Sequence, residues 1–356
     1  MSQIASPYKI AHHQAKLAAY LKGERIFPAT LELDITSRCT RICPNCPSSR
    51  SKRIFDLNWS FIDGLLASLE GQTQGLLLTG GEPTLSPRFA DVLSLARKRG
   101  FQEIAVVTNG TRLDRDDVLD ALVRQATSVR ISLYDWEAGT DAGWRKVIEN
   151  IKGLRARIDR AESTLRIGVS ALTSKDRVPL LPRIAESVHA AGAHWIYFHP
   201  ACIGWDNGCP VQVDQDGVLE SIETYQRTLR PSAGFEALIS RFRYSSKGIR
   251  FSAYHAAHFL LVIGADGLNY LGPEVKYQPR YVLADATGGR TPDFLWRPER
   301  LRKIGAITSD RYPAAKSRLR GVLYNDFIER IIDARQTREE KAILIAPDGF
   351  LFPHIL

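Results

Sequence analysis

Six apolar, β-branched runs alternate with amphipathic stretches over the first two thirds of this chain. The runs occupy residues 30–36, 75–81, 103–110, 128–135, 165–173 and 194–201. The stretches between them carry apolar residues at helical spacing, and several begin with Ser or Asp, which cap helices well. Strands that alternate with helices favour a parallel sheet built from βα units. Six such units predict an α/β fold with enough strands for an open or partial barrel, short of the eight of a full one.

The alternation breaks down after about residue 232. Two similar phrases follow, at 261–273 and 343–355, and each places an Asp-Gly turn between two apolar runs. This pattern is a strong local signal for a β-hairpin. We therefore expect three regions: an N-terminal extension over 1–29, the barrel over 30–231, and a smaller C-terminal α+β cap over 232–356. No low-complexity linker separates the last two regions, so the cap should pack directly on the barrel.

The composition is that of a globular protein that folds without disulfides. Hydrophobic residues make up 44% of the 356 residues and charged residues 24%, close to the usual values. No window reaches about 18 uninterrupted apolar residues, the length that predicts a transmembrane helix. The first residues also lack the apolar run and cleavage site of a secretory signal. We expect a cytoplasmic protein that does not associate with a membrane.

The net charge of +9 is spread along the chain rather than gathered in one arm or stripe. A scattered excess of Lys and Arg is typical of a solvated basic surface, so we do not expect nucleic acid as a partner. The five cysteines are odd in number, and three of them lie within eight positions. Such clustering indicates a metal site more often than a disulfide framework.

Cys39, Cys43 and Cys46 follow the first predicted strand with the spacing CxxxCxxC. Three thiolates this close can bind three irons of a cubane and leave the fourth iron open to another ligand. A structural zinc site is the alternative, but it needs a fourth ligand, and no other Cys or His flanks the triplet. The loop follows a strand of a parallel sheet, where active sites form. An iron-sulfur cluster is therefore the favoured interpretation.

The second predicted strand ends in GGEP and the third in TNGT. With the cysteine triplet one strand earlier, this order resembles the radical S-adenosylmethionine (SAM) superfamily over about residues 30–200. The resemblance implies a partial (β/α)6 barrel and a 4Fe-4S cluster held by Cys39, Cys43 and Cys46. It also implies that the open iron is chelated by SAM, which is cleaved reductively to a 5′-deoxyadenosyl radical that takes a hydrogen atom from the substrate.

The same resemblance implies roles for the strand ends. The methionyl amine of SAM would contact Gly80, Gly81 and Glu82. The methionine moiety would be bordered by Thr108, Asn109 and Gly110. Ser132 would contact the ribose or the methionyl carboxylate, or would simply end its strand as a satisfied hydroxyl. The superfamily often has SLDG at that point where this chain has SLYD, which leaves Asp135 without an assigned role.

The Asp-Gly hairpins resemble the SPASM or twitch extension of many radical SAM enzymes, in which nearby cysteines bind an auxiliary cluster. This chain has no Cys beside either hairpin, and its only spare thiols are Cys202 and Cys209. We expect a degenerate cap without a second cluster. Cys202, just past the sixth strand, would return a hydrogen atom to a substrate radical or would be a buried apolar residue. Tyr254, His255 and His258 would be core residues of a strand or would line the pocket.

The predicted function is abstraction of a hydrogen atom from a polar small molecule, such as a sugar, a nucleoside or a natural-product intermediate. Epimerisation or oxidation would be the outcome, and flavodoxin or ferredoxin would supply the electron. Two alternatives stay open. One is a radical SAM enzyme that modifies a peptide or RNA, although no RNA-binding signature is visible. The other is a non-catalytic zinc or iron-sulfur binding protein.

Overall fold

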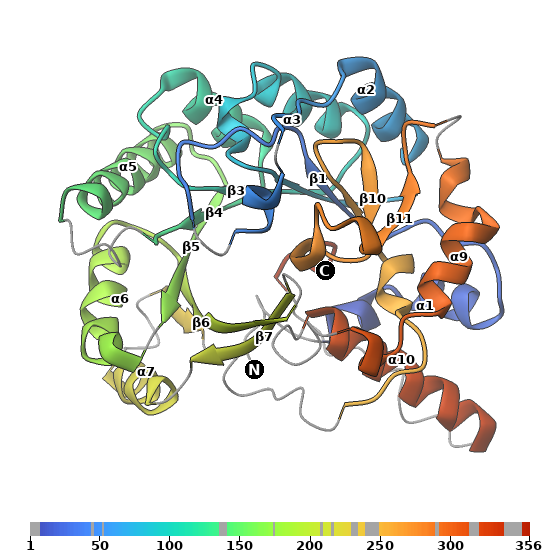
Figure 1. Ribbon diagram of the computed structural model, residues 1–356. Helices are drawn as coiled ribbons and strands as arrows, with labels where there is room; N and C mark the ends of the chain where they lie inside the picture. Colours follow the sequence, from blue (N-terminus) through green and yellow to red (C-terminus); the bar gives the residue numbers. More distant parts are fainter. Residues whose placement is uncertain are drawn as a thin grey trace.

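Six parallel strands form the barrel wall, as the sequence predicts (Figure 1). The computed structural model describes residues 8–43, 46–51, 53–134, 141–173, 175–206, 209–214, 217–228, 234–238, 249–288, 292–312, 320–337 and 351–356. The strands are β1 (Thr30–Asp34), β2 (Gly75–Thr79), β3 (Glu103–Thr108), β4 (Ser128–Ser132), β5 (Arg166–Thr173) and β6 (Trp195–Asp206). Each pairs in parallel with the next. This order places all their carboxyl ends at one end of the barrel, where ligands bind in such folds.

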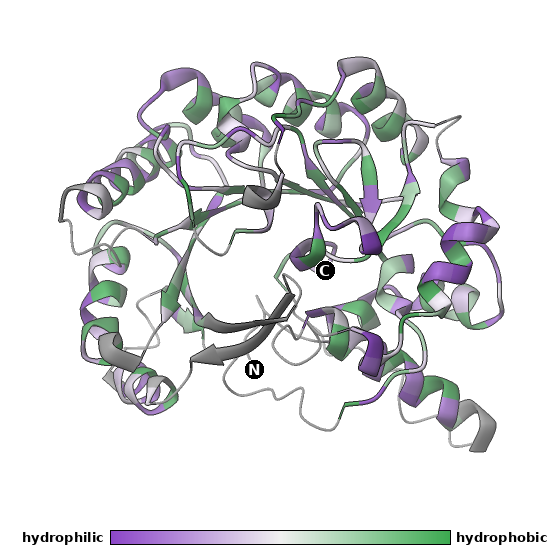
Figure 2. Ribbon diagram, in the orientation of Figure 1, coloured by the Kyte–Doolittle hydropathy of each residue, from purple (hydrophilic) through white to green (hydrophobic). Residues whose placement is uncertain are grey.

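Helices cover the outside of this wall (Figure 1). They are α2 (Trp59–Ser68), α3 (Phe89–Lys98), α4 (Asp116–Gln125), α5 (Asp141–Arg160), α6 (Leu181–Ala190) and α7 (Val218–Thr228). The α2 helix begins where the Asn58 side chain accepts a hydrogen bond from Ser60 N at 2.8 Å, a standard N-cap. Its buried face then presents Leu65 and Leu66 to the sheet. The apolar residues of the helices gather on this inner side (Figure 2). They pack against the strands in one core, which holds the strand ends in place.

The sheet continues beyond β1 with three more strands. They are β9 (Leu260–Ile263), β10 (Leu268–Tyr270) and β11 (Val282–Asp285). The β9 strand pairs in parallel with β1, and β10 returns antiparallel to it. The first Asp-Gly hairpin is thus present, and Gly267 adopts a φ of 77° in its turn, which glycine tolerates best. The region expected as a cap therefore shares one sheet with the barrel.

The second predicted hairpin, 343–355, falls mostly outside the described residues. Residues 351–356 are described and form a turn rather than a strand. His354 N donates to Glu103 Oε2 at 2.8 Å, and Lys9 Nζ donates to Phe352 O at 2.9 Å. Burial raises the pKa of Glu103 to about 7. These contacts place the segment against the amino ends of β1 and β3, at the opposite end of the barrel from the cysteine loop.

A second apolar core lies beside β9. It forms where α1 (Gln14–Leu21), α9 (Pro298–Gly305) and α10 (Arg320–Thr337) meet the short 3-10 helix η7 (His255–His258). Arg300 is buried there, and its guanidinium donates to Asn269 Oδ1, Leu295 O and Ala257 O, each at 2.8 Å. These bonds satisfy a buried charge and tie α9 to the sheet. In the described part of the chain, no helix is long and apolar enough to span a bilayer.

Candidate functional site

The cysteine loop leaves the end of β1 and reaches the short helix η2 (Pro47–Arg50). Cys39 is exposed, Cys43 and Cys46 are partly buried, and all three are free thiols. Arg41 N donates to Cys39 Sγ at 3.4 Å, and Asn109 Nδ2 lies 3.8 Å from the same sulfur. Desolvation raises the pKa of Cys39, although these two donors oppose the rise. Among the described residues, no three Cys, His, Asp or Glu side chains are arranged to hold a metal ion as they stand.

The glycine turn after β2 packs directly on the backbone of this loop. A Cβ built on Gly81 would lie 2.2 Å from Arg38 O, and one on Gly80 would lie 2.3 Å from Thr36 O. Gly80 also has a φ of 138°, which side chains rarely permit. Gly81 N donates to Thr36 O at 2.9 Å. The two glycines therefore let the turn approach the start of the cysteine loop, a role that the sequence analysis did not foresee.

Glu82 joins the ends of β2 and β3. Its side chain is fully buried, and Oε1 accepts hydrogen bonds from Thr84 Oγ1 and Thr108 Oγ1, both at 2.7 Å. Oε2 accepts Asn109 N at 2.6 Å. Asn109 Nδ2 in turn donates to Thr40 Oγ1 at 3.0 Å. The predicted residues Glu82, Thr108 and Asn109 thus form one hydrogen-bonded network that reaches the cysteine loop.

Ser132 ends β4 at the same end of the barrel, and its carbonyl accepts Arg41 Nη1 at 3.3 Å. Asp135 lies outside the described residues. Ser132 pairs in register with Ser170 of β5, and Ser170 Oγ lies 3.3 Å from His199 Nε2 of β6. Neither Ser170 nor His199 was predicted as a site residue from the sequence. The available signal was a polar residue among apolar ones near the end of each predicted strand.

The β6 strand is longer than the predicted run, which ended at 201. It runs to Asp206 and pairs antiparallel with β7 (Cys209–Asp214). The Cys202 backbone pairs with Val213 within this extension, so the residue lies in the strand rather than past it. The side chains of Cys202 and Cys209 are outside the described part of the structure.

Tyr254 belongs to the second core, and His255 and His258 lie in the short helix beside it. The expected strand is wrong here, because His255–His258 is a 3-10 helix. Tyr254 is buried, and Tyr20 Oη lies 2.6 Å from His255 Nδ1. The His258 ring packs 4.9 Å from the ring of Tyr20. These contacts favour the core interpretation for Tyr254 and His255, whereas His258 is only partly buried and lines a smaller cavity together with Tyr20 and Trp296.

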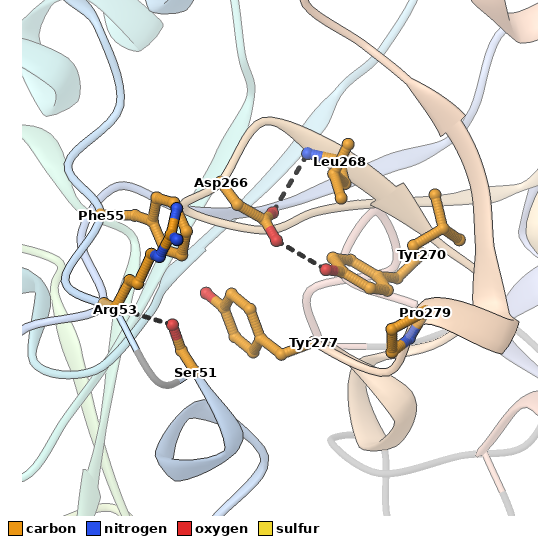
Figure 3. A pocket seen from close by; sticks show the side chains of 9 residues that line it. Ser51, Arg53, Phe55, Asp266, Leu268, Tyr270, Tyr277 and Pro279 are labelled. Carbon is orange, nitrogen blue, oxygen red and sulfur yellow. Dashed lines mark hydrogen bonds between the residues drawn. The ribbon is translucent and has the colours of Figure 1, made fainter.

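A cavity of about 330 Å³ lies between the segment after the cysteine loop and the β9–β10 hairpin (Figure 3). Phe55, Tyr270 and Tyr277 line it with aromatic rings, and Arg53 and Asp266 lie at its edge. Asp266 accepts Tyr270 Oη at 2.6 Å and Leu268 N at 3.1 Å. The cavity also lies near the start of the cysteine loop, since Ser37 N donates to the carbonyl of Phe55, one of the lining residues, at 2.8 Å.

Comparison with known proteins places this arrangement in a family. Residues 33–187 match the model of the radical SAM superfamily. The 7,8-dihydro-6-hydroxymethylpterin dimethyltransferase of Methanocaldococcus jannaschii is 27% identical over 108 residues, which are 29% of this chain and 21% of that protein. The GTP 3′,8-cyclase of a Synechococcus species is 33% identical over 143 residues, or 35% of this chain and 41% of that protein. The chain thus spans less than half the length of either relative.

Solved structures show the same fold at low sequence identity. Streptococcus suis SuiB bound to the precursor peptide SuiA has a TM-score of 0.61 at 14% identity, over 85% of this chain and 73% of that one. The anSMEcpe structure with bound AdoMet and the Cp18Cys peptide has a TM-score of 0.58 at 12% identity, over 89% of this chain and 100% of that one. The solved structures show that the fold is shared, and the match to the family model identifies residues 33–187 as a radical SAM domain. Its cofactors are those of the superfamily, a 4Fe-4S cluster and SAM.

Proposed function

We propose that this radical SAM enzyme binds its cluster through Cys39, Cys43 and Cys46 and binds SAM along the ends of β2, β3 and β4. The observation that carries the proposal is the hydrogen-bonded network that joins Glu82, Thr108 and Asn109 to the cysteine loop. When bound and reduced, the cluster supplies the electron that cleaves SAM, and the resulting 5′-deoxyadenosyl radical removes a hydrogen atom from the substrate.

The donor set of the loop fits an iron-sulfur cluster. The loop offers three thiols and no charged ligand of another kind, which is the ligand set that leaves one iron open. Arg41 N and Asn109 Nδ2 point at the Cys39 sulfur, and N–H donors stabilise the charge of a ligating thiolate. Because burial raises the pKa of Cys39, cluster binding would release its proton. Binding also requires the three side chains to turn toward a common point.

Glu82 and Ser132 keep the roles that the resemblance implies. Three donors from Thr84 and Thr108 occupy Oε1 of Glu82, whereas Oε2 accepts only the Asn109 amide within the described residues. An ammonium group would bind at Oε2, next to the glycine turn. Ser132, which stands beside Arg41 at the end of β4, would contact the ribose or the methionyl carboxylate.

We infer that the substrate is a polar small molecule that enters the aromatic-walled cavity. Its volume of about 330 Å³ is at the lower end of the range for small-molecule sites. The walls suit a planar or sugar-like ring, and Arg53 and Asp266 offer a charge of each sign. The names of the two curated relatives refer to a pterin and to GTP, which agrees with a small substrate. SuiB binds a precursor peptide, so a peptide substrate is the second candidate.

The decisive experiment measures iron, labile sulfide and SAM cleavage in protein reconstituted without oxygen. We expect about four irons per chain and 5′-deoxyadenosine formation with a strong reductant or with flavodoxin or ferredoxin. Replacing any cysteine of the triplet with Ala should abolish both, whereas the control variant Cys209→Ala should keep both. Stoichiometric zinc without labile sulfide would instead support the non-catalytic zinc protein.

The same measurement tests for a second cluster. Beside the β9–β10 hairpin, Tyr312 Oη donates to Glu274 Oε1, and burial raises the pKa of Tyr312 well above its usual value. A neutral tyrosine bonded to a carboxylate stands where the resemblance would place auxiliary ligands. About eight irons per chain would contradict this degenerate cap.

We propose Cys202 as the group that returns a hydrogen atom to the substrate radical; the thiyl radical left on its sulfur would then take one electron from the flavodoxin or ferredoxin donor and one proton from solvent. It lies on β6 near the carboxyl end of the barrel, where ligands of parallel folds bind. In D2O the product should gain deuterium, because a thiol proton exchanges with solvent. Cys202→Ala should still form 5′-deoxyadenosine but lose or scramble the product. Full product formation by that variant would leave Cys202 without a role in the chemistry.

A further inference from the structure

A buried lysine from the C-terminal region contacts the ends of β1 and β2, just before the cysteine loop and the glycine turn begin. Lys276 directly follows the short helix η8 (Pro273–Val275). Its Nζ lies 2.7 Å from Asp34 Oδ1 and 3.3 Å from Glu32 Oε1. Burial by itself would lower the pKa of Lys276, but the two carboxylates outweigh that effect and raise it. The ammonium group therefore stays charged.

The next residue binds the second oxygen of the same carboxylate. Tyr277 Oη donates to Asp34 Oδ2 at 2.8 Å. Tyr277 has a φ of 63°, in the left-handed region that residues other than glycine seldom adopt. Consecutive side chains of an extended chain point to opposite sides, and the left-handed conformation lets both side chains reach one carboxylate. A strained backbone of this kind persists where the surroundings hold it, often near a functional site.

Asp34 lies where the cysteine loop and the glycine turn both begin. It ends β1, and Thr79, which ends β2, donates its hydroxyl to Asp34 Oδ1. Lys276 Nζ also lies 3.4 Å from Thr79 Oγ1. Two residues beyond Asp34, the carbonyl of Thr36 accepts Gly81 N. The lysine thus contacts both strand ends just before the cysteine loop and the glycine turn begin.

No other cation in the described part of the chain is shown to contact Asp34. Arg320 Nη1 lies 3.3 Å from Glu32 Oε2, so Glu32 has a second cationic partner. A buried carboxylate that loses its partner must rearrange, become protonated or admit water. Loss of the Lys276 ammonium group would therefore displace Asp34, and with it the end of β1, before it displaces Glu32.

We propose that Lys276 is a positioning residue of the cofactor site, which acts through Asp34 and Thr79 to hold the cysteine loop and the glycine turn in register. The inference rests on the proposed function for the identity of the groups that these segments bind. Tyr277 adds a link to the substrate, because it shares Asp34 with Lys276 and also lines the cavity opposite Arg53 and Phe55 (Figure 3). A molecule that fills the cavity would therefore contact Tyr277, which is hydrogen-bonded to Asp34.

The first test uses the cofactor-free protein. Lys276→Met removes the ammonium group and keeps the chain length, Lys276→Arg restores a cation, and Lys152→Met replaces an exposed lysine of α5 as the matched control. Iodoacetamide alkylation of each cysteine is followed by mass spectrometry without oxygen. We expect alkylation of the partly buried Cys43 and Cys46 to become about fivefold faster in Lys276→Met, because local opening controls access to them, whereas the exposed Cys39 should change less. Cys202 and Cys209 should keep their wild-type rates, as should all five cysteines in the other two variants.

The second test uses the reconstituted enzyme. Lys276→Met should raise the KM for SAM about tenfold with a smaller change in kcat for 5′-deoxyadenosine formation, because the binding segments are displaced while the cluster remains. Lys276→Arg should recover most of the loss. Wild-type alkylation rates and KM in Lys276→Met would overturn the proposal. Equal acceleration at all five cysteines would do the same, since it would show general destabilisation.

If Lys276→Met does not fold, Tyr277→Phe tests the positioning role instead. It removes one hydrogen bond to Asp34 and leaves the ion pair, so we expect about a threefold effect on both measurements, again confined to the triplet. No effect of Tyr277→Phe on either the alkylation rates or the KM for SAM would refute the positioning role. Wild-type protein that binds no iron would refute the proposed function instead, and the alkylation test would still stand.

Discussion

Gly81→Ala tests whether the close packing of the glycine turn on the cysteine loop is needed for cofactor binding. The new Cβ would lie 2.2 Å from Arg38 O and 2.5 Å from Ser37 O. Ordinary contacts of a Cβ begin at 3.4 Å, so the turn and the loop must separate by about 1 Å. The two oxygens belong to backbone rather than to a flexible side chain, which leaves no inexpensive way to relieve the clash.

We expect Gly81→Ala to lower both the free energy of unfolding and the rate of SAM cleavage. Overpacking costs about 1–3 kcal/mol, and the Gly81 N to Thr36 O bond contributes about 1 kcal/mol more if it breaks. Together these give about 2–4 kcal/mol in the free energy of unfolding. A displacement of about 1 Å in an active site can lower the rate about a hundredfold. We therefore expect SAM cleavage to fall by about two orders of magnitude, with iron content reduced.

Gly153→Ala is the matched control, because nothing lies within 4 Å of a Cβ at that position of α5. It should keep full SAM cleavage and gain up to about 1 kcal/mol, as Ala favours a helix over Gly. The assay combines anaerobic chromatography of 5′-deoxyadenosine, iron analysis and chemical unfolding. Wild-type SAM cleavage and stability in Gly81→Ala would show that the contact is relieved elsewhere and would refute the reasoning.

Two further predictions concern buried polar side chains. Glu82→Gln turns one acceptor oxygen into a donor facing the groups that donate to it, so it should lower the free energy of unfolding by about 2–3 kcal/mol. Glu70→Gln, at an exposed ion pair with Arg99, should change little, and equal effects in chemical unfolding would contradict the network. Burial lowers the pKa of His13 to about 3. The unfolded chain binds its proton near pH 6.5, so stability should fall by about 2 kcal/mol from pH 7 to pH 5 on account of this residue. His13→Gln should show a flatter pH dependence of unfolding, and an unchanged slope would refute the assignment.

The barrel wall could be predicted because its signals are local. Each of the six predicted strands overlaps an observed one, since an apolar run and the helical spacing after it are readable from adjacent residues. The first Asp-Gly hairpin was also predicted from its own turn. The pairing of β9 with β1 was not, because Thr30 and Leu260 are joined only by the folded sheet. Local patterns do not specify which distant edge a strand will extend.

In the candidate site, too, features formed by adjacent residues could be predicted and contacts between distant residues could not. The cysteine spacing and the GGE turn were visible in the sequence, whereas the partners of Glu82 were not, because Thr108 and Asn109 reach it from the next strand. The sequence assigned Gly80 and Gly81 to a ligand. The structure shows that they first accommodate the backbone of the cysteine loop. The freedom of a glycine can be recognised in a sequence, but the neighbour that requires it cannot.

The two acidic residues of β1 indicate that another part of the chain must supply a cation to this strand. Glu32 and Asp34 alternate with leucines in a strand whose every residue is buried, and buried carboxylates require a partner. The sequence could therefore have indicated that a cation reaches β1, although not which of the 48 Lys and Arg residues it is. The structure identifies Lys276, 242 positions from Asp34. Because β1 also pairs with β9, a barrel that ended at 231 would leave both the acidic residues and the edge of β1 without partners. Residues 30–231 and the region that carries Lys276 therefore share one sheet and one buried charge cluster, so the segment that lines the aromatic cavity is part of the scaffold of the candidate site.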